Sequence, residues 1–467
     1  MIRYRLVVLC SIAAFTLVGQ ITPGDWYGTL DAMGQQLPLV IHLKDSAGSW
    51  TGTMDSPKQK AYGIEMTKVE VNGMNLVFSI DKLNASYQGS LSDSLGIVGT
   101  FKQGAFKAPL SFSQQVVEVT ESRKKQDPIE PYPYLQEEVE VLNVEGGFTL
   151  RGTLTHPDGA STTKIPCIIL ITGSGPQDRN EEILGHRPFL VLADQLTRAG
   201  YCVLRLDDRG TGKSEGTFAG ATSVDFAQDI SAALEFAKGI SYIDNQRIIL
   251  MGHSEGGMIA NMVAVNHPEV FGVISLAGPG VLGATLLMEQ QELIAKSLGA
   301  TKNELKEMRA FSADFFPLLT MDSLTIVAKK TEAFLRNYVR RSKEFKRSSK
   351  DEQETWITQN MDAYVNPWMI YFLNYNPEID LKKITCHYLA LNGSTDLQVP
   401  SSMNLNAIKA NCNPGEGKVK KIIELPGLNH LFQPSATGSP TEYGSNEITF
   451  DESAIKEILA FIEEITH

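Results

Sequence analysis

The stretch "QRIILMGHSEGGMIANMVAV", residues 246–265, decides the fold because an apolar strand pattern changes into a helical pattern at one serine. "RIIL" precedes Ser254, and "GGMIANMVAVN" follows it. In a G-x-S-x-G sequence a nucleophilic serine occupies a strained turn between a strand and a helix, where small neighbours allow unusual dihedral angles. The pattern therefore predicts Ser254 as a nucleophile at the carboxyl end of a buried strand.

A second G-x-S-x-G match, "GKSEG" at residues 212–216, lacks this context because no helical pattern follows Ser214. Its "GKS" resembles the end of a phosphate-binding loop, but Asp207 stands where that loop requires its first glycine. We therefore expect "DDRGTGKSEG" to form a turn at the carboxyl edge of a sheet and to bind no nucleotide.

Apolar strand runs alternate with helical patterns from about residue 137 onward. Strands covered on both faces have such near-continuous apolar runs, which parallel βαβ connections produce. A hairpin around Gly146-Gly147 precedes them, so we predict a doubly wound, mostly parallel sheet of eight strands that begins with two antiparallel ones. The six later runs are "IPCIILITG", "YCVLRLDD", "RIILMG", "FGVISLAG", "CHYLALNG" and "VKKIIELPG".

One interval in this pattern is too long for a simple crossover. Residues 279–385 have helical periodicity throughout, whereas a crossover between parallel strands needs only about a dozen residues. We therefore expect a helical cap inserted at about residues 279–383. It contains a basic run that could attract an anionic substrate, although a solvated helix face is the simpler interpretation; this run comprises Arg336, Arg340, Arg341, Lys343, Lys346 and Arg347.

The residues before this region predict three further segments. Residues 21–117 contain short alternating stretches broken by turn signals, which is typical of a small all-β domain, either a barrel or a sandwich. Its clearest hairpin has Asn72-Gly73 as the two positive-φ positions of a type I′ turn. Residues 118–136 are charged and rich in proline, so we expect a linker between this domain and the domain at residues 137–467.

The first twenty residues, "MIRYRLVVLCSIAAFTLVGQ", place two arginines before an apolar run that ends at small or polar residues. This order predicts a secretory signal peptide at residues 1–20 and hence a periplasmic or secreted protein. The alternative is an uncleaved anchor, for which the apolar run is short. No other segment of the sequence approaches membrane length, so we expect no stable membrane association once the leader is removed.

The formal net charge of −12 argues against nucleic acid or an anionic membrane surface as the main partner. Cys167, Cys202 and Cys386 lie in buried-strand runs, and their spacing suits neither a metal site nor a disulfide framework. We expect them to be unpaired buried thiols. The sequence implies no metal and no cofactor, and it leaves the oligomeric state open.

A serine nucleophile needs a base, an acid that orients the base, and backbone donors for the oxyanion. In a sheet of this kind the order along the chain is Ser, acid, His, with each partner in a loop after a later strand. Asp396 follows "CHYLAL" and His430 follows "VKKIIE", so these two residues are the predicted acid and base. His253, next to the nucleophile, is expected to shape the turn.

The predicted oxyanion donors are the N–H of Glu255, which follows the nucleophile, and that of Ser174 in the loop after "CIILI". Gly173 and Gly175 would let this loop turn toward a substrate. Asp178 and Arg179 would either orient substrate or form an ion pair that stabilises the loop. Further candidates for substrate contact are His186 at the start of the next helix and Trp368, Tyr371 and Phe372, which would border an acyl pocket or pack the cap.

Seven motifs together resemble the bacterial exported α/β-hydrolases that are described as esterases and are distantly related to prolyl oligopeptidases and dienelactone hydrolases. The resemblance covers residues 137–467 and implies the α/β-hydrolase fold, a triad of Ser254, Asp396 and His430, and hydrolysis of carboxylic esters with short acyl chains. The motifs are "GSGPQDRNE", "GHRPFLVLADQLTRAG", "LRLDDRGTGKSEG", "GHSEGG", "NPWMIYFLNYNP", "NGSTDLQVP" and "LPGLNHLFQ".

The sequence therefore favours a serine carboxylesterase that forms an acyl-enzyme intermediate and takes a small-molecule ester as substrate. One alternative is a serine peptidase of the prolyl oligopeptidase type that acts on short peptides. Another is a surface protein that binds glycans or lipids and retains a vestigial hydrolase domain, against which the intact set of three catalytic residues argues.

Overall fold

The computed structural model of the chain describes residues 20–32, 35–57, 61–92, 96–104, 106–115, 123–159 and 164–467. The chain divides into two compact units, residues 1–121 and 122–467. The predicted leader at residues 1–20 lies outside the described residues, apart from Gln20. None of the helices in the described ranges is long and apolar enough to cross a membrane.

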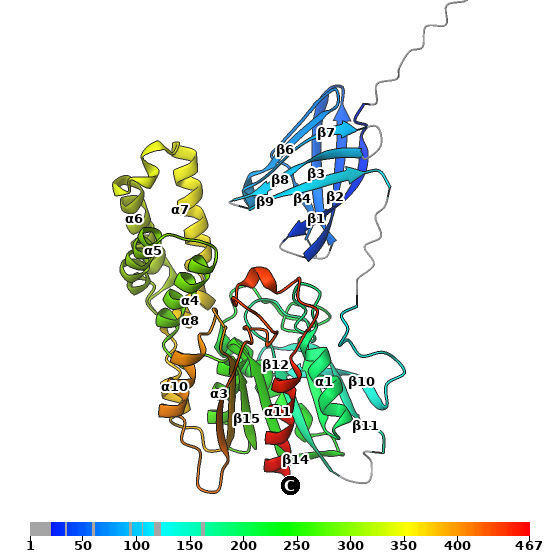
Figure 1. The fold of residues 1–467 in the computed structure, drawn as a ribbon, viewed down its shortest axis with the longest axis vertical. Coiled ribbons are helices and arrows are strands. Elements are labelled where there is room, and N and C mark those ends of the chain that lie inside the picture. Colours follow the sequence, from blue (N-terminus) through cyan, green and yellow to red (C-terminus); the bar gives the residue numbers. More distant parts are fainter. Residues whose placement is uncertain are drawn as a thin grey trace, which may run out of the picture. The chain divides into compact units, whose positions relative to one another are not determined.

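The first unit is an antiparallel meander of nine strands that curls into a barrel (Figure 1). Strand β1 pairs with both β2 and β9. The two edge strands of the sheet are β4 and β5, and only Met66 and Thr67 lie between them in the chain. The Met66 N–H donates to Gly52 O in β3 (3.0 Å) and the Thr67 N–H to Ser79 O in β6 (2.8 Å), so this segment closes the barrel. The strands are β1 (Gly24–Ala32), β2 (Gln35–Ser46), β3 (Ser49–Ser56), β4 (Ala61–Glu65), β5 (Lys68–Asn72), β6 (Asn75–Ile80), β7 (Ala85–Ser92), β8 (Gly96–Gln103) and β9 (Phe106–Ser113).

Alternate side chains of these strands fill the barrel interior. Leu39, Ile41 and Leu43 of β2 are buried there, as period-two alternation requires. Tyr87 is also fully buried, and its hydroxyl lies 3.1 Å from the carbonyl oxygens of Ile97 and Leu110. Of the two predicted architectures, the structure has the barrel, with an interior occupied by its own side chains.

The hairpin of β5 and β6 forms where predicted, but its turn differs. Asn72 pairs with Asn75, so the two loop residues are Gly73 and Met74. Gly73 has a φ of 60°, and among the described residues neither Asn72 nor Met74 has a positive φ. The predicted type I′ turn is therefore wrong. A positive φ at the first loop residue alone is that of a type II′ turn, which glycine at this position permits.

The second unit contains a sheet of eight strands in the order β10-β11-β13-β12-β14-β15-β16-β17. The pairs β10–β11 and β11–β13 are antiparallel and all other pairs are parallel, as predicted. The strands are β10 (Tyr134–Asn143), β11 (Phe148–Pro157), β12 (Ile165–Ile171), β13 (Cys202–Leu206), β14 (Ile243–His253), β15 (Gly272–Leu276), β16 (His387–Gly393) and β17 (Lys420–Leu425).

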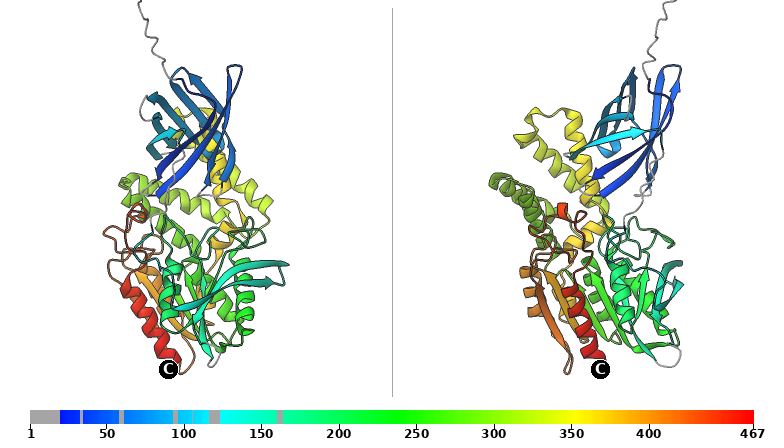
Figure 2. Two further views of the ribbon diagram at one scale, coloured as in Figure 1. Left: turned by 90° about the vertical axis from the view of Figure 1, so that its right-hand side faces the viewer. Right: turned by 45° about the vertical axis from the view of Figure 1, so that its right-hand side comes forward.

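Helices cover both faces of this sheet (Figure 2). In β12, Cys167 and Ile169 face one core, and Ile168 and Leu170 face the other. Because both faces are buried, the central strands consist of continuous apolar runs. Cys167, Cys202 and Cys386 are free and buried, which confirms the prediction of unpaired thiols, and Cys412 is also free and buried. The first core contains α2 (Ser223–Lys238), α3 (Glu255–Asn266) and α10 (Ser401–Asn411); the second contains α1 (Pro188–Arg198) and α11 (Glu452–Thr466).

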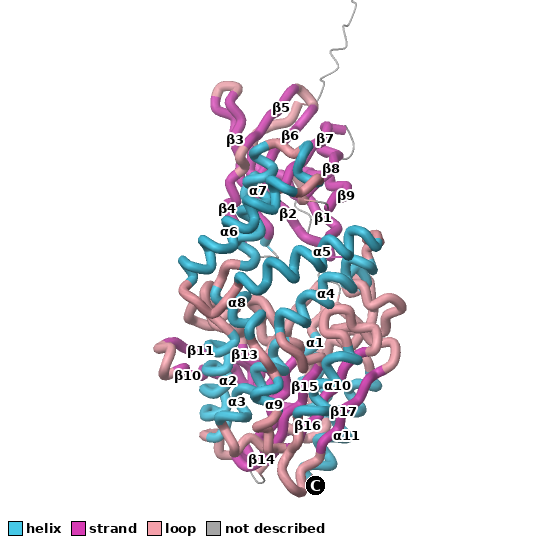
Figure 3. The backbone as a smooth tube through the Cα atoms, turned by 90° about the vertical axis from the view of Figure 1, so that its left-hand side faces the viewer, coloured by secondary structure: helices cyan, strands magenta, loops and turns pink. Residues whose placement is uncertain are grey.

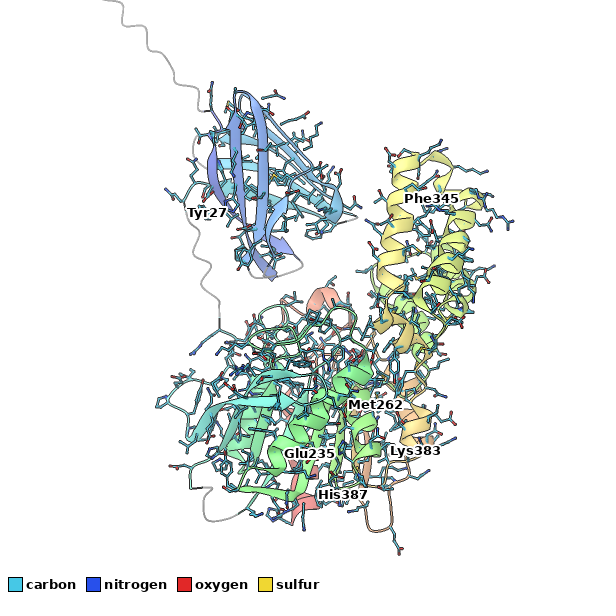
Figure 4. All side chains as sticks on the ribbon, turned by 180° about the vertical axis from the view of Figure 1, so that it is seen from behind. Tyr27, Glu235, Met262, Phe345, Lys383 and His387 are labelled. Atoms are coloured by element: carbon cyan, nitrogen blue, oxygen red, sulfur yellow. The ribbon has the colours of Figure 1, made fainter. Side chains whose placement is uncertain are left out.

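The interval between β15 and β16 is a helical insertion with its own core, formed around Phe315, Leu335 and Ile357 (Figure 3). Figure 4 shows Phe345 in this insertion and His387, at the start of β16, at the opposite end of the unit. The insertion therefore lies beyond the carboxyl ends of the parallel strands. Its helices are α4 (Gly283–Ser297), α5 (Lys302–Phe315), α6 (Leu324–Arg341), α7 (Lys350–Tyr364), α8 (Pro367–Asn374) and α9 (Glu378–Leu381).

The basic run of the insertion is a solvated surface. All six side chains of the run are exposed. Arg336 pairs with two neighbouring carboxylates, Glu332 on its own helix and Glu354 on α7. The interpretation as a solvated helix face therefore holds.

Part of the predicted linker packs on the second unit. The ammonium group of Lys124 donates to the carbonyl oxygens of Gly444 (3.1 Å) and Asn446 (2.8 Å). Asp127 is buried and pairs with Arg187 at 2.6 Å. Residues 124–127 are thus held by the second unit, and β10 begins at Tyr134, within the segment predicted as linker.

A buried ion pair joins the first strand of this sheet to a helix. Arg209, in the loop after β13, donates from Nε to Asp229 Oδ2 of α2 (2.7 Å) and from Nη2 to Asp229 Oδ1 (3.0 Å). Asn143, at the end of β10, donates to the same carboxylate at 2.6 Å. Burial raises the pKa of Asp229, although the bonds from Arg209 oppose this change. The carboxylate therefore connects β10, α2 and the loop that contains Arg209.

Replacing Asp229 by alanine should destabilise the second unit by about 3 kcal/mol, because Arg209 and Asn143 would lose their shared buried partner. Calorimetric thermal unfolding of the full chain measures this loss. The matched control is Arg336→Ala, which removes an exposed pair and should cost less than about 1 kcal/mol. A destabilisation no larger than that of the control would contradict the role of Asp229.

Candidate active site

Ser254 occupies the strained turn that the sequence predicts. Its backbone has φ 53° and ψ −119°, between the last residue of β14 and the first residue of α3. A Cβ atom at Gly252 would lie 2.0 Å from Gly256 O, and one at Gly256 would lie 2.2 Å from Ile171 O. Glycines are therefore required on both sides of the serine, and the amino-terminal end of α3, with its partial positive charge, faces Ser254.

Ser254, His430 and Asp396 are brought together at the carboxyl edge of the sheet. His430 Nε2 lies 3.1 Å from Ser254 Oγ, and His430 Nδ1 lies 2.8 Å from Asp396 Oδ2. Asp396 and His430 are 3% and 4% exposed, so solvent competes little for these hydrogen bonds. The order serine, imidazole, carboxylate is the geometry needed to transfer a proton away from the serine hydroxyl.

Backbone groups fix the acid and the base in their loops. Asp396 Oδ1 accepts the N–H of Gln398 (2.8 Å) and the N–H of Val399 (2.9 Å), which leaves Oδ2 for the imidazole. The fully buried side chain of Asn429 accepts the N–H groups of Leu431 and Gln433, both at 3.0 Å. These bonds hold the loop on either side of His430.

The loop after β12 supplies a free backbone donor near the serine. The N–H of Gly173 is engaged, since it donates to Glu181 Oε1 at 2.7 Å. No described residue accepts a hydrogen bond from the N–H of Ser174 or of Glu255, and both residues line the cavity that contains Ser254. These two amides are therefore available to an oxyanion.

The cavity at Ser254 has a volume of about 270 Å³ and lies between the sheet edge and the helical insertion. The insertion contributes an apolar wall, whereas polar side chains of the sheet-edge loops line the region around Ser254 and His430. The apolar wall consists of Leu286, Leu287, Trp368, Met369 and Phe372. Such a mixture of an apolar wall with a few polar groups is typical of small-molecule sites.

Several predicted contact residues lie elsewhere. Arg179 is buried in an ion pair with Asp207 (2.9 Å) and Glu138 (2.7 Å), so it stabilises the loop, although with partners other than its neighbour Asp178. Asp178 accepts backbone N–H groups two and four residues ahead, as in a turn. Neither residue lines the cavity.

His186, Gly175 and Tyr371 are also absent from the cavity wall. The ring nitrogens of His186 lie 2.9 Å from Thr449 Oγ1 and 3.0 Å from Tyr443 O, and burial lowers its pKa to about 4. Gly175 lines a separate cavity of about 30 Å³. Tyr371 stacks on Tyr375 instead. Gly173, Trp368 and Phe372 are the predicted contact residues that do line the cavity.

Sequence reasoning missed the two carboxylates of the cavity wall, Glu181 and Glu255. The sequence predicts only a backbone role for Glu255, yet its Oε1 accepts hydrogen bonds from Ser223 Oγ (2.6 Å) and Trp368 Nε1 (2.9 Å). Burial raises its pKa, which the bonds from Ser223, Trp368 and Ser174 oppose. The sequence signal that could have found Glu255 is its place directly after Ser254, since a residue next to a nucleophile lies at the same cavity.

Glu181 pairs with His253. Two glutamines also line the cavity, Gln398 from the loop that contains Asp396 and Gln290 from α4. No local pattern marks these residues, because their partners are distant in the sequence. The Gln290 side chain donates to Gln398 O at 3.2 Å, which joins the insertion to the Asp396 loop.

Among the described residues, one group of side chains could hold a metal ion, namely Glu235, His267 and Glu269 on α2 and beyond α3. Lys238 already pairs with Glu235 (2.8 Å) and Glu269 (3.1 Å). None of these residues lines the cavity, so we assign no metal to the site.

Comparisons with known proteins agree with this architecture. Residues 187–362 match the model of the family described as serine aminopeptidase, S33; the segment includes Ser254 and ends before Asp396. Esterase EstD of Thermotoga maritima is 22% identical over 293 residues, which are 62% of this chain and 65% of the relative. The 2-hydroxy-6-oxononadienedioate/2-hydroxy-6-oxononatrienedioate hydrolase of Escherichia coli is 32% identical over 146 residues, 31% of this chain and 46% of the relative.

The chain thus spans less than two thirds of the length of these relatives. A hypothetical protein from Pseudomonas aeruginosa aligns in structure with a TM-score of 0.46 and 16% identity, over 75% of this chain and 99% of its own. The sheet order and the strained serine turn are those of a serine-hydrolase architecture, and the sequence is similar to those of the esterase and the hydrolase named above.

Proposed function

We propose that this protein is a serine carboxylesterase. Ser254 Oγ attacks the ester carbonyl carbon while His430 Nε2 takes its proton, and the N–H groups of Ser174 and Glu255 stabilise the oxyanion. His430 then returns the proton to the leaving alcohol, and an acyl-enzyme remains. Water repeats the sequence and releases the acid, so one ester and one water give one acid and one alcohol.

The observation that carries this proposal is the continuous hydrogen-bonded line from Ser254 through His430 to Asp396, at 3.1 and 2.8 Å, beside two unengaged amides. Asp396 keeps the imidazole in the tautomer that accepts the serine proton, because Nδ1 must donate to the carboxylate. Since Nε2 then has its lone pair directed to the serine, the base is poised before substrate binds.

The cavity supports a small, largely apolar acyl group as the substrate moiety. Its apolar wall comes from two helices of the insertion, α4 and α8, and Gly283 fits against α8 so closely that a Cβ there would lie 1.8 Å from Phe372 O. Packing of this kind leaves little room for the wall to move outward. We therefore propose short-chain esters as the preferred substrates, and export to the periplasm or exterior as the setting in which they are met.

Replacing Ser254 by alanine should lower kcat for p-nitrophenyl butyrate by at least about 10⁴-fold and abolish labelling by a fluorophosphonate, because no other nucleophile is aligned with the base. The matched control is Ser214→Ala in the second G-x-S-x-G sequence. Its hydroxyl donates to Asp207 O and accepts the N–H of Arg151, so it should affect stability alone. Retained turnover in Ser254→Ala would overturn the assignment.

Replacing Phe372 by alanine should move the optimal acyl chain toward longer esters, because it removes part of the apolar wall of the cavity. A series of p-nitrophenyl esters from acetate to decanoate measures this shift as the ratio of kcat/KM values. Tyr371→Ala, on the same helix but outside the cavity wall, is the control and should leave the ratio unchanged. An unchanged optimum in Phe372→Ala would place the acyl group elsewhere.

A specific observation also favours a second candidate, a serine peptidase that binds a free amino group. Two buried carboxylates, Glu181 and Glu255, line the cavity, and each has one oxygen without a hydrogen-bond partner among the described residues. An ammonium group would complete their bonding.

Alanine p-nitroanilide, its N-acetyl form and alanine methyl ester separate the two candidates. The esterase proposal expects turnover of the methyl ester and at least about 100-fold slower turnover of both anilides, since an amide needs a better-protonated leaving group. Efficient cleavage of the free anilide alone, with loss on acetylation, would establish the peptidase instead.

A further inference from the structure

His253 lies beside the proposed triad with both ring nitrogens hydrogen-bonded. Nδ1 is 2.9 Å from Glu181 Oε1, and Nε2 is 2.9 Å from the backbone oxygen of His430. His253 and Glu181 are 6% and 4% exposed. The His253 ring packs on the His430 ring with 4.9 Å between centroids. Glu181 and His253 thus form a second carboxylate–histidine pair, which has no role in the proposed proton transfer.

The partners of His253 determine where its protons lie. A carbonyl oxygen can only accept, so Nε2 must donate to the backbone of His430. Glu181 Oε1 already accepts the N–H of Gly173, and a carboxylate likewise only accepts. Both ring nitrogens of His253 therefore donate, which makes the ring an imidazolium that pairs with the Glu181 carboxylate.

The same pair connects three segments that build the site. Gly173 belongs to the loop that offers the Ser174 amide, His253 precedes the nucleophile, and the carbonyl of His430 belongs to the base. Glu181 has a positive φ of 52°, and a non-glycine residue adopts this backbone conformation only at a cost in free energy. One hydrogen-bonded chain thus runs from the oxyanion loop through the nucleophile turn to the catalytic histidine.

We propose that Glu181 and His253 form a charged positioning pair that keeps the oxyanion loop, the nucleophile and the base in register for the same reaction. This role rests on the proposed function, because it acts through Ser254 and His430 and takes no part in bond making. The pair keeps both hydrogen bonds only while His253 carries both ring protons, since a neutral ring can donate either to Glu181 Oε1 or to the carbonyl oxygen of His430 but not to both.

The charges around the pair favour the doubly protonated ring. Burial by itself lowers the pKa of His253, but the charge of Glu181, its hydrogen bond, the carbonyl of His430 and the charge of Asp396 outweigh burial and raise it. The other ionisable groups nearby are His430, Glu255 and Asp208, the last with its pKa raised by burial to about 8. With a raised pKa, the pair is intact at low pH and loses its proton as pH rises through that value.

Replacing Glu181 by glutamine removes the charge that opposes burial, so the pKa of His253 should fall below its ordinary value. The variant ring would then be neutral at the alkaline end of the pH range tested and donate one hydrogen bond there instead of two. We expect kcat for p-nitrophenyl butyrate to fall roughly 10- to 100-fold with little change in KM, as for a displaced catalytic group. The loss should grow as pH rises from about 5 to about 8, because the variant ring keeps both protons only at the acid end.

The control is Glu137→Gln, which alters a carboxylate–histidine pair with a half-exposed carboxylate, neither member of which lines the cavity. His156 Nε2 lies 3.0 Å from Glu137 Oε1, and the His156 ring is also buried. This control should give a ratio of variant to wild-type kcat that is independent of pH. A pH-independent ratio for Glu181→Gln as well, or a kcat within about twofold of the wild type, would overturn the positioning role.

A double-variant cycle tests whether the two residues act as one unit. If they do, Glu181→Gln combined with His253→Asn should lower kcat no further than the more damaging single change. Additive losses would contradict the pair.

Nitrogen NMR of the His253 ring in Ser254→Ala tests the charge without any need for turnover. Two protonated ring nitrogens at pH 7 are expected, and a neutral ring would overturn the charged pair even if kcat falls. Absence of ester hydrolysis by the wild type would instead overturn the proposed function, and with it the catalytic consequence of the pair, while the NMR result would still decide its charge.

Discussion

The candidate active site depends on one steric constraint, the contact between backbone segments at the strained serine. The residues two positions before and two positions after Ser254 have no room for side chains, since Cβ atoms at Gly252 and Gly256 would lie 2.0 and 2.2 Å from carbonyl oxygens. A positive φ at a serine costs of the order of 1–3 kcal/mol, which surrounding packing must offset. The bond from the Ser254 N–H to Leu276 O, at 2.8 Å, is part of that support.

This constraint places the remaining parts of the site. Because Gly256 contacts the end of β12, the loop that follows β12 begins beside Ser254, and Ser174 of this loop lines the same cavity. The loops after β16 and β17 meet at the same sheet edge. Gly393 lies so close to the second loop that its Cβ would be 2.1 Å from Leu428 O, and the Thr395 N–H donates to that oxygen at 3.0 Å. Asp396 and His430 are therefore positioned by backbone contacts.

Buried charge is the second feature that the site has to accommodate. Asp208, Glu181 and Glu255 lie near one another in a region of low dielectric, where like charges repel strongly. Burial raises the pKa of Asp208 to about 8, Glu181 pairs with His253, and Glu255 accepts hydrogen bonds from Ser223 and from Trp368 of the insertion. The bond from Trp368 also joins the insertion to the residue after the nucleophile, so the cavity wall and the nucleophile turn are coupled.

The sequence by itself determined the sheet, the nucleophile turn and the positions of Asp396 and His430. These features have local or topological signals, which can be read from the sequence alone. The signals are apolar runs for strands buried on both faces, a serine flanked by glycines, and the order of the strands along the chain. Tertiary structure alone decided which polar side chains share the cavity. Arg179 and His186 have reactive groups at suitable places in the sequence, yet both are bound to residues that are distant in the chain, and the Tyr371 ring stacks on Tyr375 instead of lining the cavity. Glu181 and His253 pair across 72 positions, and the carbonyl of His430 is a further 177 positions from His253; such contacts between distant segments leave no periodic signal in the chain.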